Sequence, residues 1–282
     1  MRLLVAVDKR EGAKDALELA RVLAAGEGGG AASALVVTVH FTGPLPMEYA
    51  LLPGEEAGEA EPLFEQARER LAGMDVETRA YGGGSPAGII TTLAEREGFD
   101  AIVVGSPHRG AFGRVMIGSV ATSLLNGAPT DVAVAPKGYA RVQHEAPRDI
   151  AVGFDGTPES KVALRHAEAL AKRTNARIKL LTVVKPPAPA PVMVPAYTPQ
   201  FPPEPDKVIN EGLNSIDPLL AAERTRLDGD PATELARACE EGVDLLVVGS
   251  RGYGPMTRVL LGSVSRQLAK KAPCPVLVAS RP

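Results

Sequence analysis

A glycine-rich segment that occurs twice constrains the fold of this 282-residue chain more than any other feature. The second copy contains Gly249 and Gly252, followed after nine residues by Gly262-Ser263. The first copy contains Gly105 and Gly118-Ser119, each 144 residues before its counterpart. A repeat of this length predicts two successive domains of the same fold, each long enough to bury its own core.

Each copy lies between a short apolar run and a helical pattern. In the second copy the run 243–248 is a predicted strand, and Ser263 is predicted to cap a helix over 264–271. Glycine N–H groups can approach an anion without side-chain obstruction, and the free N–H groups of a helix start add a partial charge of roughly +0.5. The pattern predicts a phosphate-binding site; glycines that only end strands and close turns are the alternative.

Short apolar runs alternate with segments of helical periodicity through both halves. In the first half the predicted strands are 3–7, 35–41, 76–81, 100–104 and 132–135, and the predicted helices are 13–25, 63–71, 87–97 and 120–126. The segment 42–62, rich in proline, glycine and acids, is predicted to be an irregular loop. The second half repeats this order, with strands at 150–154, 178–184, 243–248 and 276–279 and helices at 158–173, 232–241 and 264–271. We therefore predict an α/β fold of two tandem Rossmann-like domains, each an open five-stranded parallel sheet with helices on both faces.

A polar segment with the helix breakers Gly138 and Pro147 separates the two halves. We place the first domain at 1–137, the linker at 138–148 and the second domain at 149–282. The last strands of the two halves are expected to pair with each other, because each would otherwise leave an unpaired sheet edge.

Composition excludes several classes of function. A net charge of −3 argues against a broad basic face for nucleic acid or a membrane surface, and no apolar run approaches the ~18 residues that cross a bilayer, so we expect a cytoplasmic protein. The two cysteines, Cys239 and Cys274, fall in separate elements without CxxC spacing. We expect them to be reduced core residues, and neither a disulfide framework nor a metal site is indicated.

These features resemble the universal stress protein family in its tandem form, over nearly the whole chain. Nucleotide-binding members carry a glycine, two residues, a glycine, nine residues, and then glycine with serine or threonine. Gly249, Gly252, Gly262 and Ser263 match this pattern completely. The resemblance implies that this segment, with Val264 at the helix start, binds the phosphates of ATP, and that Mg²⁺ is an optional companion of the nucleotide.

The resemblance also implies which residues of the second half contact the rest of an adenine nucleotide. Asp155, after the first strand, would meet the ribose or adenine side, and Val183 or Val184 would lie against adenine. Alternatively, Asp155 is a turn residue that bonds its own backbone, and the valines pack in the core. Arg258 and its first-half equivalent Arg114 could pair with a terminal phosphate, although solvated surface arginine is the alternative. Arg251, beside Gly252, is a further candidate nucleotide-binding residue.

The first half matches the family pattern less completely. His108 stands where the second glycine is expected, and its side chain would disfavour a left-handed backbone and obstruct a phosphate. Histidine can also donate a hydrogen bond to a phosphate. We expect nucleotide mainly in the second half; the matching positions of the first half are Asp8, Val39, Gly105, Gly118, Ser119 and Val120.

The leading hypothesis is an ATP-binding stress or signalling protein in which the ligand state alters contact with a protein partner. No P-loop and no catalytic base can be identified, so an enzyme is not predicted. A module of the same fold that binds partners without nucleotide, and a slow ATPase, are the alternatives. The proline-rich segment 186–205 is either a lid over the ligand or an irregular loop. Association of whole chains into a homo-oligomer is left open.

Overall fold

The computed structural model describes residues 1–26, 32–40, 57–106, 118–185, 205–250 and 262–280. The first half contains β1 (Arg2–Ala6), α1 (Gly12–Ala24), β2 (Ser33–His40), α3 (Ala57–Arg70), β3 (Asp75–Gly82), α4 (Pro86–Glu97), β4 (Ala101–Gly105), α5 (Ser119–Leu124) and β5 (Asp131–Ala135). A short 3-10 helix, η2 (Tyr139–Arg141), leads to the second half. That half contains β6 (Asp149–Gly153), α6 (Pro158–Thr174), β7 (Arg177–Val184), α7 (Pro205–Ser215), β8 (Ala222–Asp228), α8 (Pro231–Glu240), β9 (Leu245–Gly249), α9 (Ser263–Lys271) and β10 (Val276–Ala279).

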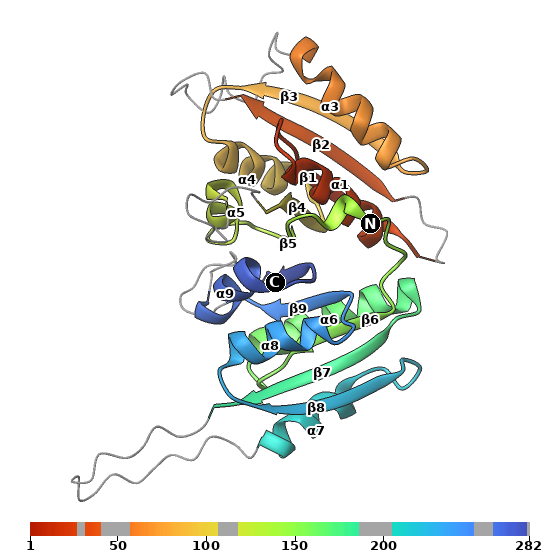
Figure 1. Ribbon diagram of the computed structural model, residues 1–282, viewed down its shortest axis with the longest axis vertical. Coiled ribbons are helices and arrows are strands. Elements are labelled where there is room, and N and C mark those ends of the chain that lie inside the picture. The colour runs from red at the N-terminus through yellow and green to blue at the C-terminus, as the bar shows by residue number, and fades with distance from the viewer. Residues whose placement is uncertain (27–31, 41–56, 107–117, 186–204, 251–261, 281–282) are drawn as a thin grey trace, which may run out of the picture.

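The strands form one ten-stranded sheet in the order β3-β2-β1-β4-β5-β10-β9-β6-β7-β8. Within each half all neighbouring strands are parallel. The two halves lie end to end along the sheet, with β3 at one edge and β8 at the other (Figure 1). The predicted fold class is therefore confirmed, and the two five-stranded sheets are continuous with each other.

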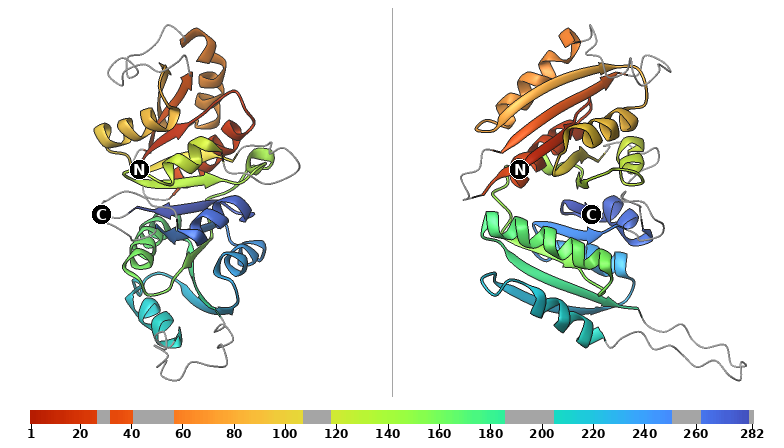
Figure 2. Two further views of the ribbon diagram at one scale, coloured as in Figure 1. Left: turned by 90° about the vertical axis from the view of Figure 1, so that its left-hand side faces the viewer. Right: turned by 180° about the vertical axis from the view of Figure 1, so that it is seen from behind.

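The continuity comes from the last strand of each half. β5 and β10 pair antiparallel, with Leu277 opposite Ala133 and Val278 opposite Val132. The expected pairing of the last strands is thus observed, and Figure 2 shows these strands side by side at the middle of the molecule. All four of these side chains are almost completely buried, so the seam is part of the protein core.

Helices cover both faces of the sheet, as predicted. Side chains alternate along the strands, so Leu3 and Val5 of β1 enter the core under α1, α3, α6 and α7, whereas Leu4 enters the core under α4, α5, α8 and α9. The first of these cores runs through both halves without a break. The two halves therefore share their packing as well as their sheet.

One sequence prediction about the first half is wrong. The segment 57–62, predicted to belong to a loop, is the start of α3, and Pro62 lies inside that helix. Proline removes a single intrahelical hydrogen bond at this position. Phe64, Ala67 and Leu71 are buried against the sheet, and their burial outweighs that loss.

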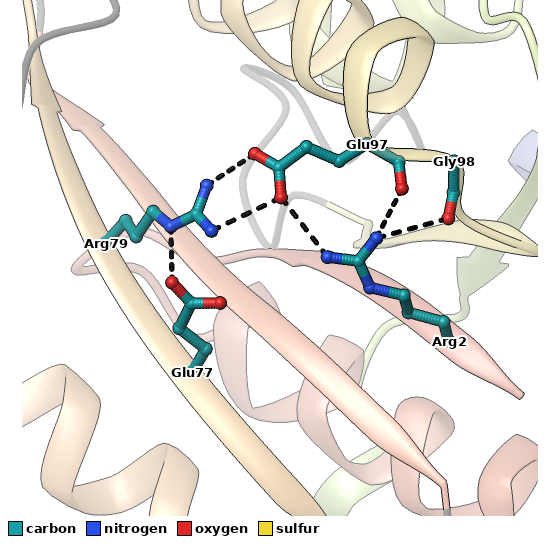
Figure 3. Close-up of polar contacts among 5 residues, drawn as sticks. All are labelled: Arg2, Glu77, Arg79, Glu97 and Gly98. Atoms are coloured by element: carbon teal, nitrogen blue, oxygen red, sulfur yellow. Dashed lines mark hydrogen bonds and ion pairs between the residues drawn. The ribbon is translucent and has the colours of Figure 1, made fainter.

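An ion-pair network ties the end of α4 to two strands of the first half (Figure 3). Glu97 contacts the guanidinium groups of both Arg2 and Arg79, and Arg79 also binds Glu77 at 2.7 Å. The hydrogen bonds that Arg79 donates to Glu77 and Glu97 raise its pKa, so it stays charged. The network therefore fixes α4 against β1 and β3, on the side of the sheet opposite to the carboxyl ends of the strands.

Buried carboxylates on α1 hold the segment that joins the halves. Asp15 accepts hydrogen bonds from the N–H groups of Gly138 and Ala140 at 2.9 and 2.8 Å. Glu18 accepts one from the N–H of His144 at 2.9 Å and pairs with Arg21 at 2.7 Å. Burial raises the pKa of Glu18, but these hydrogen bonds outweigh it and the net shift is downward. The predicted boundaries of the linker stay a prediction, although this segment packs against the first half.

Candidate ligand-binding cleft

A cleft of about 600 Å³ opens at the carboxyl ends of β6 and β9 in the second half. These strands are neighbours in the sheet, and the chain continues from β6 to one side and from β9 to the other, so the cleft lies where the strand order reverses. Open α/β sheets bind ligands at this point. The lining residues come from six elements and the turns beside them: Gly153, Phe154, Asp155, Thr157, Glu159, Ser160, Leu181, Val183, Pro231, Leu235, Val248, Gly249, Ser250, Gly262, Ser263, Val264 and Ser265.

The start of α9 forms the polar end of this cleft. The helix begins at Ser263, and Gly262 is its N-cap with no side-chain hydrogen bond. The prediction that Ser263 caps the helix is therefore wrong by one position. Because glycine has no side chain that could bond the N–H groups of the first turn, these groups stay available to an anion in the cleft. The helix start also carries a partial positive charge of roughly +0.5, which favours an anion there.

Ser250 is a polar residue of the cleft that the sequence analysis did not select. It is 3% exposed, and its N–H donates to the carbonyl of Ala279 at 3.1 Å. Its hydroxyl Oγ is buried and has no hydrogen-bond partner among the described residues. Buried hydroxyls are normally paired, so this hydroxyl is a candidate donor to a polar ligand. Its place between Gly249 and Gly252 was the only signal in the sequence.

Asp155 lies at the opposite side of the same cleft. Its Oδ1 accepts hydrogen bonds from the N–H and Oγ1 of Thr157 at 3.1 and 2.6 Å. This is the turn role considered as the alternative for Asp155. The other oxygen, Oδ2, has no partner among the described residues, so the turn role leaves one acceptor available to a ligand. The Thr157 hydroxyl in turn accepts from the N–H of Ser160 and caps α6.

Val183 and Val184 are separated by the alternation of the strand. Val183 lines the cleft and packs against the core, whereas Val184 is not part of the cleft wall. The Val184 carbonyl accepts a hydrogen bond from the N–H of Gly229 at 2.9 Å. Of the two valines predicted to lie against a base, only Val183 therefore lines the cleft.

Gly249 is required by the backbone packing beside it. A Cβ atom there would lie 2.6 Å from the carbonyl oxygen of Glu159 in the first turn of α6. Gly105, its counterpart, would place a Cβ only 1.9 Å from the carbonyl oxygen of Gly12. Both glycines therefore allow a helix to approach the end of a strand. The alternative considered from the sequence was that the glycines end strands and close turns, so this packing role was not predicted.

The first half has an equivalent but smaller cleft of about 310 Å³. It is lined by the predicted Asp8, Val39, Gly105, Gly118, Ser119 and Val120. Arg10 occupies the position of Thr157, and its guanidinium lies 3.7 Å from Asp8. The helix that follows, α5, has only 6 residues, against 9 in α9.

Several predicted residues lie outside the described part of the chain. These are Arg251, Gly252, Arg258, Arg114 and His108, together with residues 186–204 of the segment 186–205 considered as a lid. Among the described residues, no group of three or more histidine, cysteine, aspartate or glutamate side chains gathers to hold a metal ion. Within the same residues, every helix is too short or too polar to span a membrane.

Comparison with protein families identifies the class to which this fold and cleft belong. The model described as the universal stress protein family matches residues 1–136 and again residues 147–280. The two matches together cover nearly the whole chain. The chain therefore belongs to the universal stress protein family and contains its domain twice.

Individual relatives and solved structures agree with this assignment. The chain is 34% identical over 181 residues to a universal stress protein of Mycolicibacterium smegmatis, a match that covers 63% of this chain and 60% of that protein. It is 28% identical over 264 residues to one of Mycobacterium tuberculosis, covering 87% of this chain and 88% of the relative. Its fold is similar to that of a universal stress protein from Archaeoglobus fulgidus, with a TM-score of 0.69, 19% identity, and coverage of 100% and 98% of the two chains.

Proposed function

We propose that the second half of this protein binds an adenine nucleotide, with ATP as the expected ligand, and that the bound state alters contact with a protein partner. The observation that carries the proposal is the unpaired Ser250 hydroxyl, which lies in the same cleft as the uncapped start of α9. A buried hydroxyl donor beside free helix N–H groups is suited to phosphate oxygens.

The remaining cleft residues fit the other parts of a nucleotide. The free Oδ2 of Asp155 can accept hydrogen bonds from ribose hydroxyls, which are donors as well as acceptors. Val183, Leu181 and Leu235 provide apolar surface in the same cleft for a base. A volume of about 600 Å³ lies in the range of pockets that bind small molecules, roughly 300–1,000 Å³.

The negative charge of the cleft favours a nucleotide that binds together with Mg²⁺. The acidic residues Asp155 and Glu159 both line the cleft, so a polyphosphate there would be disfavoured unless its charge is screened. A divalent cation that enters with the nucleotide would supply this screening through phosphate and water oxygens. We therefore include Mg²⁺ in the proposal as a companion of ATP.

The first half is a candidate for an interaction role without nucleotide. Its cleft has about half the volume, and Asp8 is engaged both by the N–H of Arg10 at 2.9 Å and by the Arg10 guanidinium. The six-residue α5 presents a shorter helix behind Gly118 than α9 does behind Gly262. These differences favour nucleotide in the second half alone.

The proposal is tested by thermal unfolding of the full chain with ATP, ADP, AMP and adenosine, each with and without Mg²⁺. ATP at 100 times its dissociation constant should stabilise the protein by roughly 2.7 kcal/mol. Adenosine should bind more weakly, because it lacks the groups that meet α9. No shift with any of the four ligands would contradict nucleotide binding and favour the interaction module, and phosphate release in the same samples would indicate an ATPase.

A further inference from the structure

The two cysteines, far apart in the sequence, lie together in the second half. Cys239 is in the last turn of α8, and Cys274 is in the turn between α9 and β10. Both are free thiols, both are 6% exposed, and both belong to the same hydrophobic core. The neighbouring Cys239 and burial raise the pKa of Cys274, in agreement with the common packing of the two residues.

Both cysteines line a cavity that is separate from the nucleotide cleft. Cys239 and Cys274 line a space of about 410 Å³ beside the segment that joins the two halves. Tyr139, His144 and Asp244 line the same space. The two cysteines therefore line one cavity from two different elements.

The segment between the two cysteines contains the polar part of the nucleotide cleft. β9, Ser250, Gly262 and the whole of α9 lie between residues 239 and 274. Leu235, one turn before Cys239 on α8, lines the cleft directly. A covalent bond between the thiols would thus close a ring around the segment that forms one side of the cleft.

We propose that Cys239 and Cys274 form an intramolecular disulfide when the protein meets a hydroperoxide. In the first step the Cys239 sulfur attacks the peroxide, the O–O bond breaks, and a sulfenic acid and water or an alcohol form. In the second step the Cys274 sulfur attacks the sulfenic sulfur, the S–O bond breaks, and the Cys274 proton leaves with the hydroxyl group as water. Each sulfur is oxidised by one electron equivalent, and the peroxide is reduced by two.

The first half does not repeat this arrangement. Its corresponding positions are Ala94 in α4 and Thr130 before β5. Since these are the only two cysteines in the chain, oxidation would act on the second half alone. The redox-sensitive pair is therefore in the same half as the proposed nucleotide site. The formation of the disulfide can be measured whether or not the protein binds nucleotide.

The experiment treats the reduced full chain with hydrogen peroxide and measures its intact mass after denaturation and blocking of free thiols. We expect a loss of about 2 Da in a monomeric product, with no thiol left to block, reversed by a dithiol reductant. After digestion with trypsin, the peptide that begins at Ala238 should be linked to the peptide that begins at Ala272. The oxidised protein should also unfold at a higher temperature than the reduced protein, because the bond restricts the unfolded chain.

Cys239→Ser and Cys274→Ser serve as matched controls, and neither should lose the 2 Da. The proposal would be overturned by thiols that stay free under peroxide that oxidises glutathione fully. It would also be overturned by separate sulfinic or sulfonic acids without a cross-link, or by a disulfide between two chains. The peptide map of the parent protein decides among these outcomes even if a variant fails to fold.

Discussion

The two halves of this protein share one strand order, yet they differ in the cleft at the carboxyl ends of their strands. The cleft of the second half is about 600 Å³ and that of the first about 310 Å³. Thr157 caps α6 in one half, whereas Arg10 lies beside Asp8 in the other. The cores alternate apolar residues in the same way in both halves. The comparison teaches that the repeat conserves packing, while a few residues in turns decide what each cleft can bind.

The largest effects are expected where the halves agree, at the paired glycines. Gly249→Ala and Gly105→Ala should each destabilise the protein by about 1–3 kcal/mol, because the new Cβ would overlap a helix carbonyl. Gly105→Ala should cost more, since its clash is at 1.9 Å against 2.6 Å. Urea denaturation measures both values.

Gly127→Ala is the control for these two glycines, because its nearest atom beyond its chain neighbours is 3.8 Å from the added Cβ. It should change the free energy of unfolding by less than about 0.5 kcal/mol. Equal free energies of unfolding for all three variants would show that the close approach of a helix does not require glycine at positions 105 and 249.

Where the halves differ, the serine after each central strand provides a matched pair. Ser250→Ala should weaken ATP binding by about 1 kcal/mol, or roughly fivefold, because the hydroxyl loses a phosphate contact. Ser106→Ala, the equivalent change in the first half, should leave the affinity unchanged. Titration calorimetry of the full chains measures this difference. A larger loss of ATP affinity from Ser106→Ala would indicate that the ATP site is in the first half.

The seam between the halves is also asymmetric. His166 of α6 lies 2.6 Å from Asp131 of β5, and Asp131 also accepts hydrogen bonds from the N–H and hydroxyl of Ser280. The hydrogen bond to Asp131 raises the pKa of His166; burial and the charge of Arg165 oppose the rise. The equivalent positions on the other side of the seam are Leu19 and Pro275, which do not titrate.

The sign of the resulting pH dependence follows from the raised pKa. Charged His166 stabilises the fold below its unfolded pKa of roughly 6.5, and this stabilisation is lost as the pH rises through the higher folded pKa. The side chain is 38% exposed, so we expect at most about 1 kcal/mol after solvent screening. The stability difference between the parent and His166→Gln should therefore be larger at pH 6 than at pH 9. An equal stability difference at pH 6 and pH 9 would show that the ion pair between His166 and Asp131 does not stabilise the seam.

The smallest effects are expected in the ion pairs at the amino ends of the strands. Glu97→Gln breaks contacts to Arg2 and Arg79, whereas Asp149→Asn in the second half weakens a pair with the exposed Arg177. We expect a loss of about 1 kcal/mol or less for the first and a smaller loss for the second, both reduced by salt. Denaturation at low and high ionic strength measures them, and a larger cost for Asp149→Asn would reverse this ranking of the halves.

Much of the fold could be predicted from the sequence because its core strands are continuous apolar runs. β8 could not be assigned in this way, since Glu223, Arg224, Thr225 and Arg226 are all exposed on an edge strand. The start of α3 was missed because Pro62 is a helix breaker by local rules, and tertiary burial overrides those rules.

The candidate cleft was predictable to the extent that its residues belong to a spaced motif. Asp155, Val183, Gly249, Gly262, Ser263 and Val264 meet in one cleft. The contribution of Ser250 depends on burial without a partner among the described residues, and the cavity shared by Cys239 and Cys274 depends on tertiary packing. Neither property is encoded in local spacing.

The most direct test of the central claim is the number of ATP molecules bound per chain, measured by equilibrium dialysis of three proteins. Ser263→Asp and Ser119→Asp place a carboxylate at the first position of α9 and α5, where it favours the helix but repels a phosphate. We predict one ATP for the parent and for Ser119→Asp, and none for Ser263→Asp. Two ATP molecules in the parent, or loss of binding only in Ser119→Asp, would contradict a nucleotide site confined to the second half.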